Sequence, residues 1–293
     1  MTGSGTQTDP YIVDSWAEFE SVVTKSRVVI KFNPDAENKI IDMNKIYPEG
    51  CPIYTIGTFS QVHGNGWEIQ NLYLKNPLFR GGGVAISGFK FTSFNHETSQ
   101  AFLLGTSGYR SLFEKNIFSG KTCSTGFLTP LASGGDYGTA IDCYNNSFGL
   151  TVYNDVTFQL ANYLDASSDK KRDVMFNNIK IQLTGNSKIN SNGLFGECKY
   201  HNFANNRINV IANTGCDFPI VKESSGFSGN VILGSNTGTI KPLYSGTCSG
   251  VNIYNSDTLN YTGTDSRFKG CTTEQMRNAE YLQSIGFAIG VEE

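Results

Sequence analysis

The chain has 293 residues, of which 17% are charged and 12% aromatic, and its formal net charge is −3. A weakly acidic chain without a sustained run of Lys or Arg lacks the electrostatic footprint of a protein that binds nucleic acid or an anionic membrane, so neither is expected as a partner. No stretch approaches the roughly 18 apolar residues of a membrane span, and the start lacks the regions of a signal peptide, so we expect a soluble protein made without a Sec signal.

Seven cysteines are scattered along the chain, and no two of them have the Cys-x-x-Cys spacing of a zinc or redox site. An odd number of scattered cysteines is typical of reduced thiols that are buried as small apolar side chains. The sequence therefore predicts assembly in a reducing cytoplasm, and it indicates no metal site and no cofactor.

The N-terminal region combines one predicted helix with short strands. Residues 1–9 have no periodicity and are predicted as a flexible arm. Ser15 and Glu18 have the spacing of a capping box, and an apolar stripe begins at Trp16, so a helix is predicted over about residues 15–24. Such a helix is suited to cover the exposed end of a stack of coils. The short β-branched segments that follow predict the first strands.

A short pattern, an apolar residue followed three places later by asparagine, recurs between residues 113 and 230. Its asparagines are 24 to 32 residues apart, and recurrence at this distance is typical of a solenoid, whose coils bury their apolar faces by stacking. Amides aligned at one corner of parallel coils are expected to hydrogen-bond from coil to coil. The predicted ladder consists of Asn116, Asn146, Asn178, Asn206 and Asn230.

We therefore predict an all-β fold, a single-stranded parallel β-helix over residues 10–270. The coils are not of equal length, and the longest insertions lie within residues 119–141, 152–173 and 184–193. In repeat proteins such insertions gather on one face and often make the working surface, so functional residues are expected there.

The C-terminal residues 271–293 are predicted as a helical cap. Thr272 and Gln275 have capping-box spacing, an apolar stripe follows, and Gly286 stands where a helix C-cap is expected, which predicts a helix over about residues 273–285. This helix is expected to close the other end of the rod or to dock a neighbouring subunit.

Three segments carry a resemblance to a known family: residues 5–13 (GTQTDPYIV), residues 64–72 (GNGWEIQNL), and residues 273–276 (TEQM) with 281–287 (YLQSIGF). Together they resemble the pectin-lyase-like right-handed parallel β-helices, most closely those of phage or prophage virion proteins and of surface proteins from Gram-positive gut bacteria. The resemblance implies right-handed winding and a phage structural or receptor-facing protein. It implies a location in the virion, other virion proteins as partners, and a homotrimer as one oligomeric state.

A β-helical enzyme that cleaves polysaccharide needs two carboxylates about 5 Å or about 6.5 to 9.5 Å apart, or acidic residues that hold calcium. The candidates on or near the long coils are Asp136, Asp142, Asp155, Asp165, Asp169, Asp173 and Glu197. Of these we favour Asp136, Asp142 and Glu197. Scattered acidic residues on loops are more often solvated surface. No Asp-x-Asp pair is present for calcium, and Arg207, which adjoins a ladder asparagine, is expected to be structural.

Carbohydrate binding requires less, because exposed aromatic rings and a few polar side chains are sufficient. The candidates on or near the longer coils are Tyr109, Tyr137, Tyr153 and Tyr163. Tyrosine in a β-rich protein is, however, more often half-buried packing.

Three functions fit the sequence. The first is a non-enzymatic virion protein, a β-helical rod that presents loops to host-surface glycan or to other virion proteins. The second is a tailspike-type polysaccharide depolymerase, either a glycoside hydrolase or a lyase. The third is a bacterial surface β-helix adhesin, which the missing secretion signal disfavours. We favour the first, because the chain is short, the repeat contains no obvious acidic pair, and the two helices are suited to docking.

Overall fold

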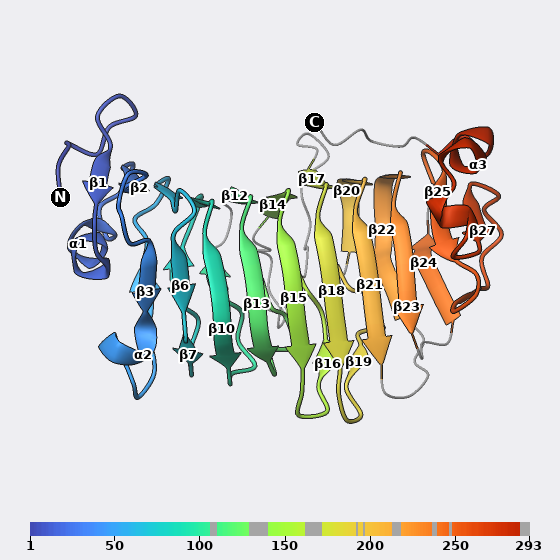
Figure 1. Ribbon diagram of the computed structural model, residues 1–293, viewed down its shortest axis with the longest axis horizontal. Helices are drawn as coiled ribbons and strands as arrows, with labels where there is room; N and C mark the ends of the chain where they lie inside the picture. The colour runs from blue at the N-terminus through green and yellow to red at the C-terminus, as the bar shows by residue number, and fades with distance from the viewer. Residues whose placement is uncertain are drawn as a thin grey trace.

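The computed structural model describes residues 1–105, 110–128, 140–161, 172–191, 193–195, 197–212, 218–235, 239–245 and 248–287. Within these residues the chain winds into an elongated parallel β-helix, and Figure 1 shows it advancing from the blue N-terminal end to the red C-terminal end. The near strands run downward and the chain returns behind them, so the winding is right-handed, as expected for parallel crossovers. The predicted fold class is confirmed.

Two long parallel sheets and two short ones form the walls of the rod. Sheet 1 contains, in spatial order, β1 (Tyr11–Val13), β2 (Val29–Phe32), β5 (Gln61–His63), β9 (Ala85–Ser87), β12 (Arg110–Glu114), β14 (Ala140–Tyr144), β17 (Arg172–Met175), β20 (Glu197–Ala204), β22 (Phe218–Ser228), β24 (Thr239–Ser245) and β26 (Asn260–Tyr261). Sheet 2 contains β3 (Ile40–Asp42), β6 (Glu68–Gln70), β10 (Lys90–His96), β13 (Ile117–Thr122), β15 (Ser147–Val152), β18 (Asn178–Leu183), β21 (Arg207–Ala212), β23 (Val231–Ser235), β25 (Asn252–Asn255) and β27 (Phe268–Cys271), with β7 (Tyr73–Leu74) beside β10. The short sheets are β4 (Tyr54–Thr55), β8 (Phe79–Gly81) and β11 (Leu103–Gly105), and β16 (Thr157–Phe158) with β19 (Lys188–Ile189).

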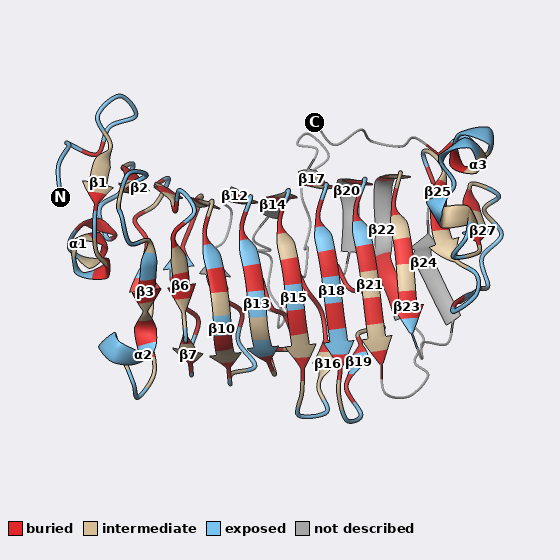
Figure 2. Cartoon of the chain, in the orientation of Figure 1, coloured by how far each residue is buried: buried red, intermediate tan, exposed pale blue. Residues whose placement is uncertain are grey.

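Side chains at equivalent positions of successive coils lie over one another. Phe148, Ile179 and Ile208 are consecutive partners across β15, β18 and β21. Along β18 every second residue is buried and the residues between are exposed, which Figure 2 shows as alternating red and pale blue bands. The buried set forms one continuous apolar core along the rod. Each coil thus completes its core only with its neighbours, as the repeat predicts.

Two-residue corners join sheet 1 to sheet 2 in the central coils. The first residue of each corner has a positive φ between 53° and 69°, in the left-handed region where Gly and Asn cost least. These first residues are Gly88, Lys115, Asn145, Phe176, Asn205 and Gly229. The left-handed residue turns the chain through the corner and lets the next side chain point inward.

In five of these corners the inward-pointing second residue is an asparagine, and these asparagines form a buried ladder that Asn252 extends by one coil. The Oδ1 of Asn146 accepts hydrogen bonds from the backbone N–H and the side-chain amide of Asn116, at 3.0 and 3.1 Å. The Oδ1 of Asn177 serves Asn146 in the same way, at 3.0 and 3.1 Å. The ladder members, each at most 1% exposed, are Asn116, Asn146, Asn177, Asn206, Asn230 and Asn252.

The predicted ladder is wrong at one position, because Asn177 and not Asn178 occupies the corner. Asn178 is the exposed first residue of β18. The sequence does distinguish the two asparagines, because the residue two places after a ladder asparagine points inward and is apolar. Asn177 is followed at this distance by Ile179, which is apolar and buried, whereas Asn178 is followed by Lys180, which is exposed. The ladder also continues one coil further than predicted, to Asn252.

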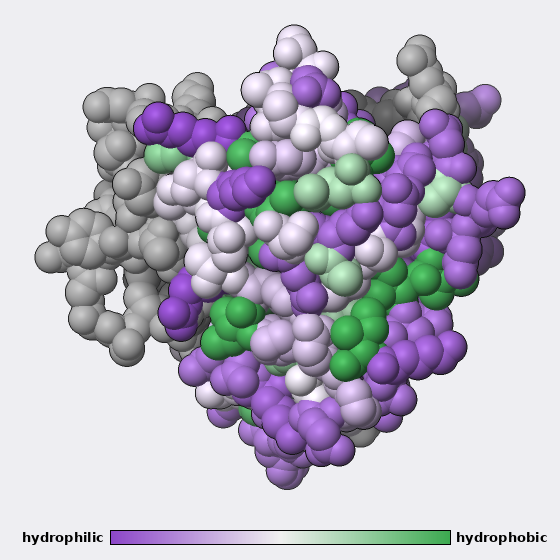
Figure 3. Space-filling view, turned by 90° about the vertical axis from the view of Figure 1, so that its left-hand side faces the viewer, coloured by the Kyte–Doolittle hydropathy of each residue, from purple (hydrophilic) through white to green (hydrophobic). Residues whose placement is uncertain are grey.

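The N-terminal end is covered by α1 (Trp16–Val22), where the sequence predicts a helix. The Ser15 hydroxyl caps it by accepting from the Glu18 backbone N–H at 3.2 Å. The indole of Trp16 donates to the Tyr54 hydroxyl at 2.9 Å and ties the helix to the first short sheet. Figure 3 views this end and shows hydrophobic green groups scattered among polar ones, so the core is covered. A short helix that the sequence did not predict, α2 (Met43–Ile46), follows β3.

Residues 1–9, expected as a flexible arm, lie against the first coil. Thr2 forms an antiparallel bridge with Ile12. The carbonyl of Gly5 accepts a hydrogen bond from the Val29 backbone N–H at 2.8 Å. The segment thereby covers the outer edge of sheet 1.

We expect the stability of the fold to depend on pH through His96. This side chain is fully buried, its Nε2 has no hydrogen-bond partner within the described residues, and burial lowers its pKa from 6.5 to about 4. The unfolded chain therefore binds this proton at a higher pH than the folded chain does. The free energy of unfolding has its full value above pH 6.5 and decreases by about 3 kcal/mol as the pH drops toward 4. Urea denaturation at several pH values measures this loss. The variant His96→Met is expected to lack it, and an unchanged pH dependence in that variant contradicts the assignment.

Candidate functional site

The C-terminal cap is built from two short helices. The Thr272 hydroxyl accepts from the Gln275 backbone N–H at 3.2 Å, and the Gln275 side chain accepts from the Thr272 N–H at 2.9 Å, which completes the predicted capping box. The single helix predicted over residues 273–285 is, however, divided into the 3₁₀-helix η1 (Gln275–Arg277) and α3 (Ala279–Ser284). The division falls at Asn278, which has extended backbone and whose side chain caps α3 by accepting from the Tyr281 N–H at 3.0 Å.

The end of α3 folds the chain back onto its own helix. Gly286 has a φ of 79°, and its N–H donates to the Gln283 carbonyl at 2.9 Å, while the Phe287 N–H donates to the Leu282 carbonyl at 3.0 Å. This is a Schellman turn, in which the residue after the glycine contacts the last turn of the helix. Leu282 and Phe287 accordingly belong to one buried cluster that includes Ile253 of β25.

The cap lies against the outer face of sheet 2. Ile253 and its partner Val231 belong to the cluster of the cap and not to the main core, because they point away from the inside of the rod. The cap thus makes a second, separate core over the last strands. Figure 1 shows α3 at the C-terminal end of the rod.

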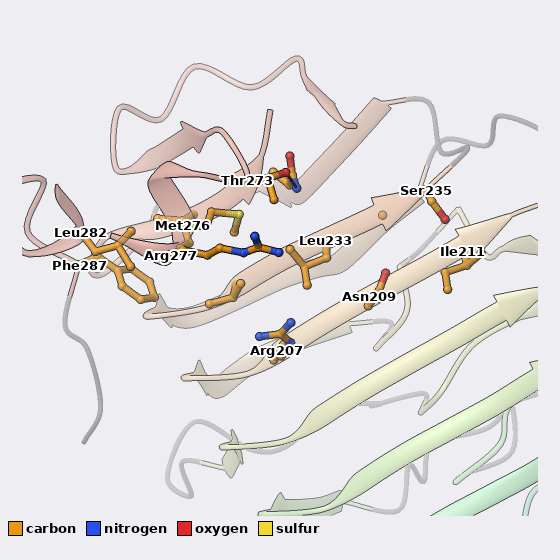
Figure 4. Close-up of a pocket in the computed structure, with 14 residues that line it drawn as sticks. Arg207, Asn209, Ile211, Leu233, Ser235, Thr273, Met276, Arg277, Leu282 and Phe287 are labelled. Atoms are coloured by element: carbon orange, nitrogen blue, oxygen red, sulfur yellow. Dashed lines mark hydrogen bonds between the residues drawn. The ribbon is translucent and has the colours of Figure 1, made fainter. Parts of the chain in front are cut away.

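A groove of about 390 Å³ lies between the cap and the outer face of β21 and β23 (Figure 4). Outward-pointing residues of the two strands form the floor of the groove. In the register of sheet 2, Arg207 on β21 is the partner of Val231 on β23, and Asn209 is the partner of Leu233. Its complete lining is Arg207, Asn209, Ile211, Val231, Leu233, Gly234, Ser235, Ile253, Asn255, Thr273, Met276, Arg277, Leu282 and Phe287. A pocket of this volume with an apolar lining and a few polar groups has the character of a ligand site.

Two arginines border the groove from opposite sides. Arg207 begins β21, Arg277 ends η1, and Figure 4 shows Arg277 extending from the cap toward Leu233. Among the described residues neither guanidinium has a carboxylate within ion-pair distance. Arg267, which lies nearby in the sequence, differs because it forms a two-point pair with Asp265 at 3.1 Å and so holds the pKa of that carboxyl well below its usual value. Within the part of the chain that the structure describes, the groove therefore presents two positive charges without a carboxylate partner.

The polar side chains of the groove differ in whether they are already hydrogen-bonded within the protein or can bind a ligand directly. The side-chain amide of Asn255 donates to the Thr273 hydroxyl at 3.0 Å, so these two groups hold each other. Asn209 and Ser235 make no side-chain hydrogen bond within the described residues, and both line the groove. They can serve a ligand without first breaking a protein contact.

Of the three predicted catalytic carboxylates, the structure describes the side chain of one, Asp142. Asp142 is 1% exposed on β14, where its Oδ1 accepts from the Asp173 backbone N–H at 3.2 Å. The Asp173 carboxylate in turn accepts from the Tyr144 hydroxyl at 2.6 Å. Glu197 begins β20, but its side chain lies outside the described residues, as does Asp136 altogether.

Of the predicted sugar-binding tyrosines, the structure describes one. Tyr153 follows β15, and its hydroxyl donates to the Asn95 side chain at 3.0 Å, while partial burial raises its pKa. It links two coils of the rod. Tyr109, Tyr137 and Tyr163 lie outside the described residues.

The groove residues were not predicted, and only part of their signal is in the sequence. Arg207 directly follows ladder residue Asn206, and residues in this position point outward in each central coil, so its exposure follows from the repeat. Arg277 and Phe287 line the same groove as Arg207 because of the place where the cap docks on sheet 2. The periodicity of the sequence does not predict this place.

Among the described residues no group of three or more His, Cys, Asp or Glu side chains is arranged to hold a metal ion. Within the same part of the chain, no helix has the length and apolar character needed to cross a bilayer.

The chain matches no family model, and comparison with curated proteins and with solved structures gave no match.

Proposed function

We propose that this protein is a non-enzymatic virion component that adheres to acidic host-surface glycan through the groove. The observation that carries the proposal is the pair Arg207 and Arg277, which border a groove with a largely apolar lining. A guanidinium binds a carboxylate or phosphate through two parallel hydrogen bonds, which makes arginine the preferred partner of such groups. Aliphatic side chains such as Leu233 and Met276 fit the C–H face of a sugar, and Asn209 and Ser235 can bind its hydroxyls.

The charge distribution around the groove supports an anionic ligand. Strands β10, β13, β15, β18, β21 and β23 of sheet 2 contain no Asp or Glu. They do contain Lys90, Lys121, Lys180 and Arg207, so these six strands carry positive charge although the whole chain carries a net charge of −3. Such a local field attracts an anionic chain toward the groove. The virion setting rests on the resemblance of the terminal segments and suits a rigid rod.

A polysaccharide depolymerase is the second candidate, favoured by one observation. Asp142 and Asp173 are adjacent on β14 and β17, and two neighbouring carboxylates are what glycoside hydrolysis requires. The burial of Asp142 opposes this role, because a substrate must reach both carboxylates. A bacterial surface adhesin, the third candidate, would use the same groove, and electron microscopy of purified particles separates it from a virion protein.

The test is binding of the intact protein to a printed array of neutral and uronic-acid-containing oligosaccharides, followed by calorimetry on the best acidic ligand. We expect Arg207→Ala and Arg277→Ala each to weaken binding about tenfold and the double variant about 100-fold, since a hydrogen bond to a charged group contributes roughly 1.5–3 kcal/mol. The loss should grow smaller at high salt.

The matched control is Lys39→Ala/Lys45→Ala, which removes two positive charges at the other end of the rod and is expected to leave binding unchanged. Binding that survives in the double arginine variant contradicts the proposal. New reducing ends or unsaturated sugars in the incubated mixture establish the depolymerase instead.

A further inference from the structure

One of the left-handed corners carries a residue that the fold does not need. Phe176 has a φ of 58° and a side chain that is 52% exposed. Four of the six corners have Gly or Asn at this position, which adopt left-handed backbone at the least cost. The backbone N–H of Phe176 donates to the Ala204 carbonyl at 3.2 Å, a bond that any residue other than proline makes. The left-handed backbone at Phe176 is strained, and the Phe side chain adds no contact that the fold requires, so a functional role for this residue should be considered.

The corner residues form a ridge along the rod, and amides flank Phe176 on it. Asn145 and Asn205 occupy the same corner position in the coils before and after, at the strand spacing of about 4.8 Å. Both are exposed, as is Asn178, two residues after Phe176. Within the described residues, these three side-chain amides make no hydrogen bond.

The ridge reaches the groove through Arg207. In the register of sheet 2, Asn178 is the direct partner of Arg207 on the next strand. Phe176 and Asn178 therefore lie on one side of an arginine whose other side borders the groove. A ligand of several units that places one unit in the groove can place another on the ridge.

We propose that Phe176 is a stacking platform for a pyranose ring of the same glycan that enters the groove, with Asn145, Asn178 and Asn205 binding its hydroxyls. This inference rests on the proposed function. An exposed aromatic ring offers its face to the C–H face of a sugar, and the amides around it both donate and accept hydrogen bonds. A protein partner fits less well, because protein hot spots are aromatic residues within a dense apolar patch, whereas here the neighbours are amides.

The inference is tested with Phe176→Asn in the full-length protein. This variant places the residue type of the neighbouring corners at position 176, so its Tm should equal or exceed that of the wild type by up to about 3 °C. Its affinity for an acidic oligosaccharide of four or more units should nevertheless fall about tenfold. Lys115→Asn is the matched control, because it relieves the same backbone strain two coils away and should leave binding unchanged.

Three outcomes decide between the proposals. If Phe176→Asn binds like the wild type while the double arginine variant does not, the ridge assignment is wrong and the groove stands. If Lys115→Asn loses as much affinity as Phe176→Asn, corner geometry and not the ring is responsible, which also overturns the ridge. If the wild type binds no oligosaccharide on the array, both proposals fail. Phe176→Leu, which keeps the strain and removes the aromatic face, should show the same affinity loss even if the asparagine variant folds poorly.

Discussion

Replacing Asn177 by leucine is expected to lower the free energy of unfolding by about 4 kcal/mol, whereas the same replacement at Asn178 should change it by less than about 0.5 kcal/mol. The side-chain amide of Asn177 donates to the carbonyls of Cys143 and Met175 and to the Oδ1 of Asn206, at 2.9 to 3.1 Å. Its own Oδ1 accepts from the backbone and the side chain of Asn146. Leucine has a similar volume but removes all of these hydrogen bonds, including the one made by the buried backbone N–H of Asn146, and each buried group left unpaired costs roughly 1–3 kcal/mol.

Urea denaturation of the two variants and the wild type, followed by circular dichroism, gives the comparison. Because a solenoid can unfold in parts, the midpoint and the slope of each transition should be compared before a free energy is derived. The two asparagines are neighbours in the sequence and share composition and charge effects, so any difference reports the corner position alone. Equal destabilisation by the two leucines would show that the ladder does not support the fold as the structure indicates.

The pattern that predicts the fold is local, which is why it can be found without a structure. An apolar residue, an asparagine and a second apolar residue recur in each central coil, since every coil solves the same packing problem. The sequence defines the position of the ladder within one repeat less sharply, because Asn177 and Asn178 are adjacent and only the burial of Ile179 distinguishes them. Propensity gives neither residue an advantage.

The candidate site is less accessible to sequence reasoning, because it joins segments that no repeat relates. Arg207 belongs to the regular face of sheet 2, whereas Arg277 belongs to a cap that docks on that face through Leu282 and Phe287. The capping box of Thr272 and Gln275 is visible in the sequence, but the surface that the cap covers depends on long-range packing. The exposure of Phe176 could be inferred only once the register of the corner was known.

Phe118→Ala is the second change with a large expected effect, a loss of about 4 kcal/mol in the free energy of unfolding. The ring of Phe118 is fully buried and stacks between Phe91 and Phe148, with centroids 5.2 and 5.1 Å apart and planes inclined by 17° and 2°. It also meets the edges of Phe102 and Phe127 at 5.3 and 5.7 Å. Removal breaks both stacks and leaves a cavity in the middle of the rod, where neighbouring coils cannot move together without losing the register of sheet 2.

The preceding residue provides the control for Phe118, because Ile117 lies on the same strand with its side chain 40% exposed. Ile117→Ala should cost less than about 1 kcal/mol, since it removes a side chain that is already partly in water. Phe118→Leu should fall between the two, because it restores part of the volume without the stacked faces. Chemical denaturation of the three variants measures the order. If Ile117→Ala destabilises as much as Phe118→Ala, β13 does not present these two residues to opposite sides, and the inward and outward assignment of sheet 2, including the groove floor at Arg207 and Asn209, is incorrect.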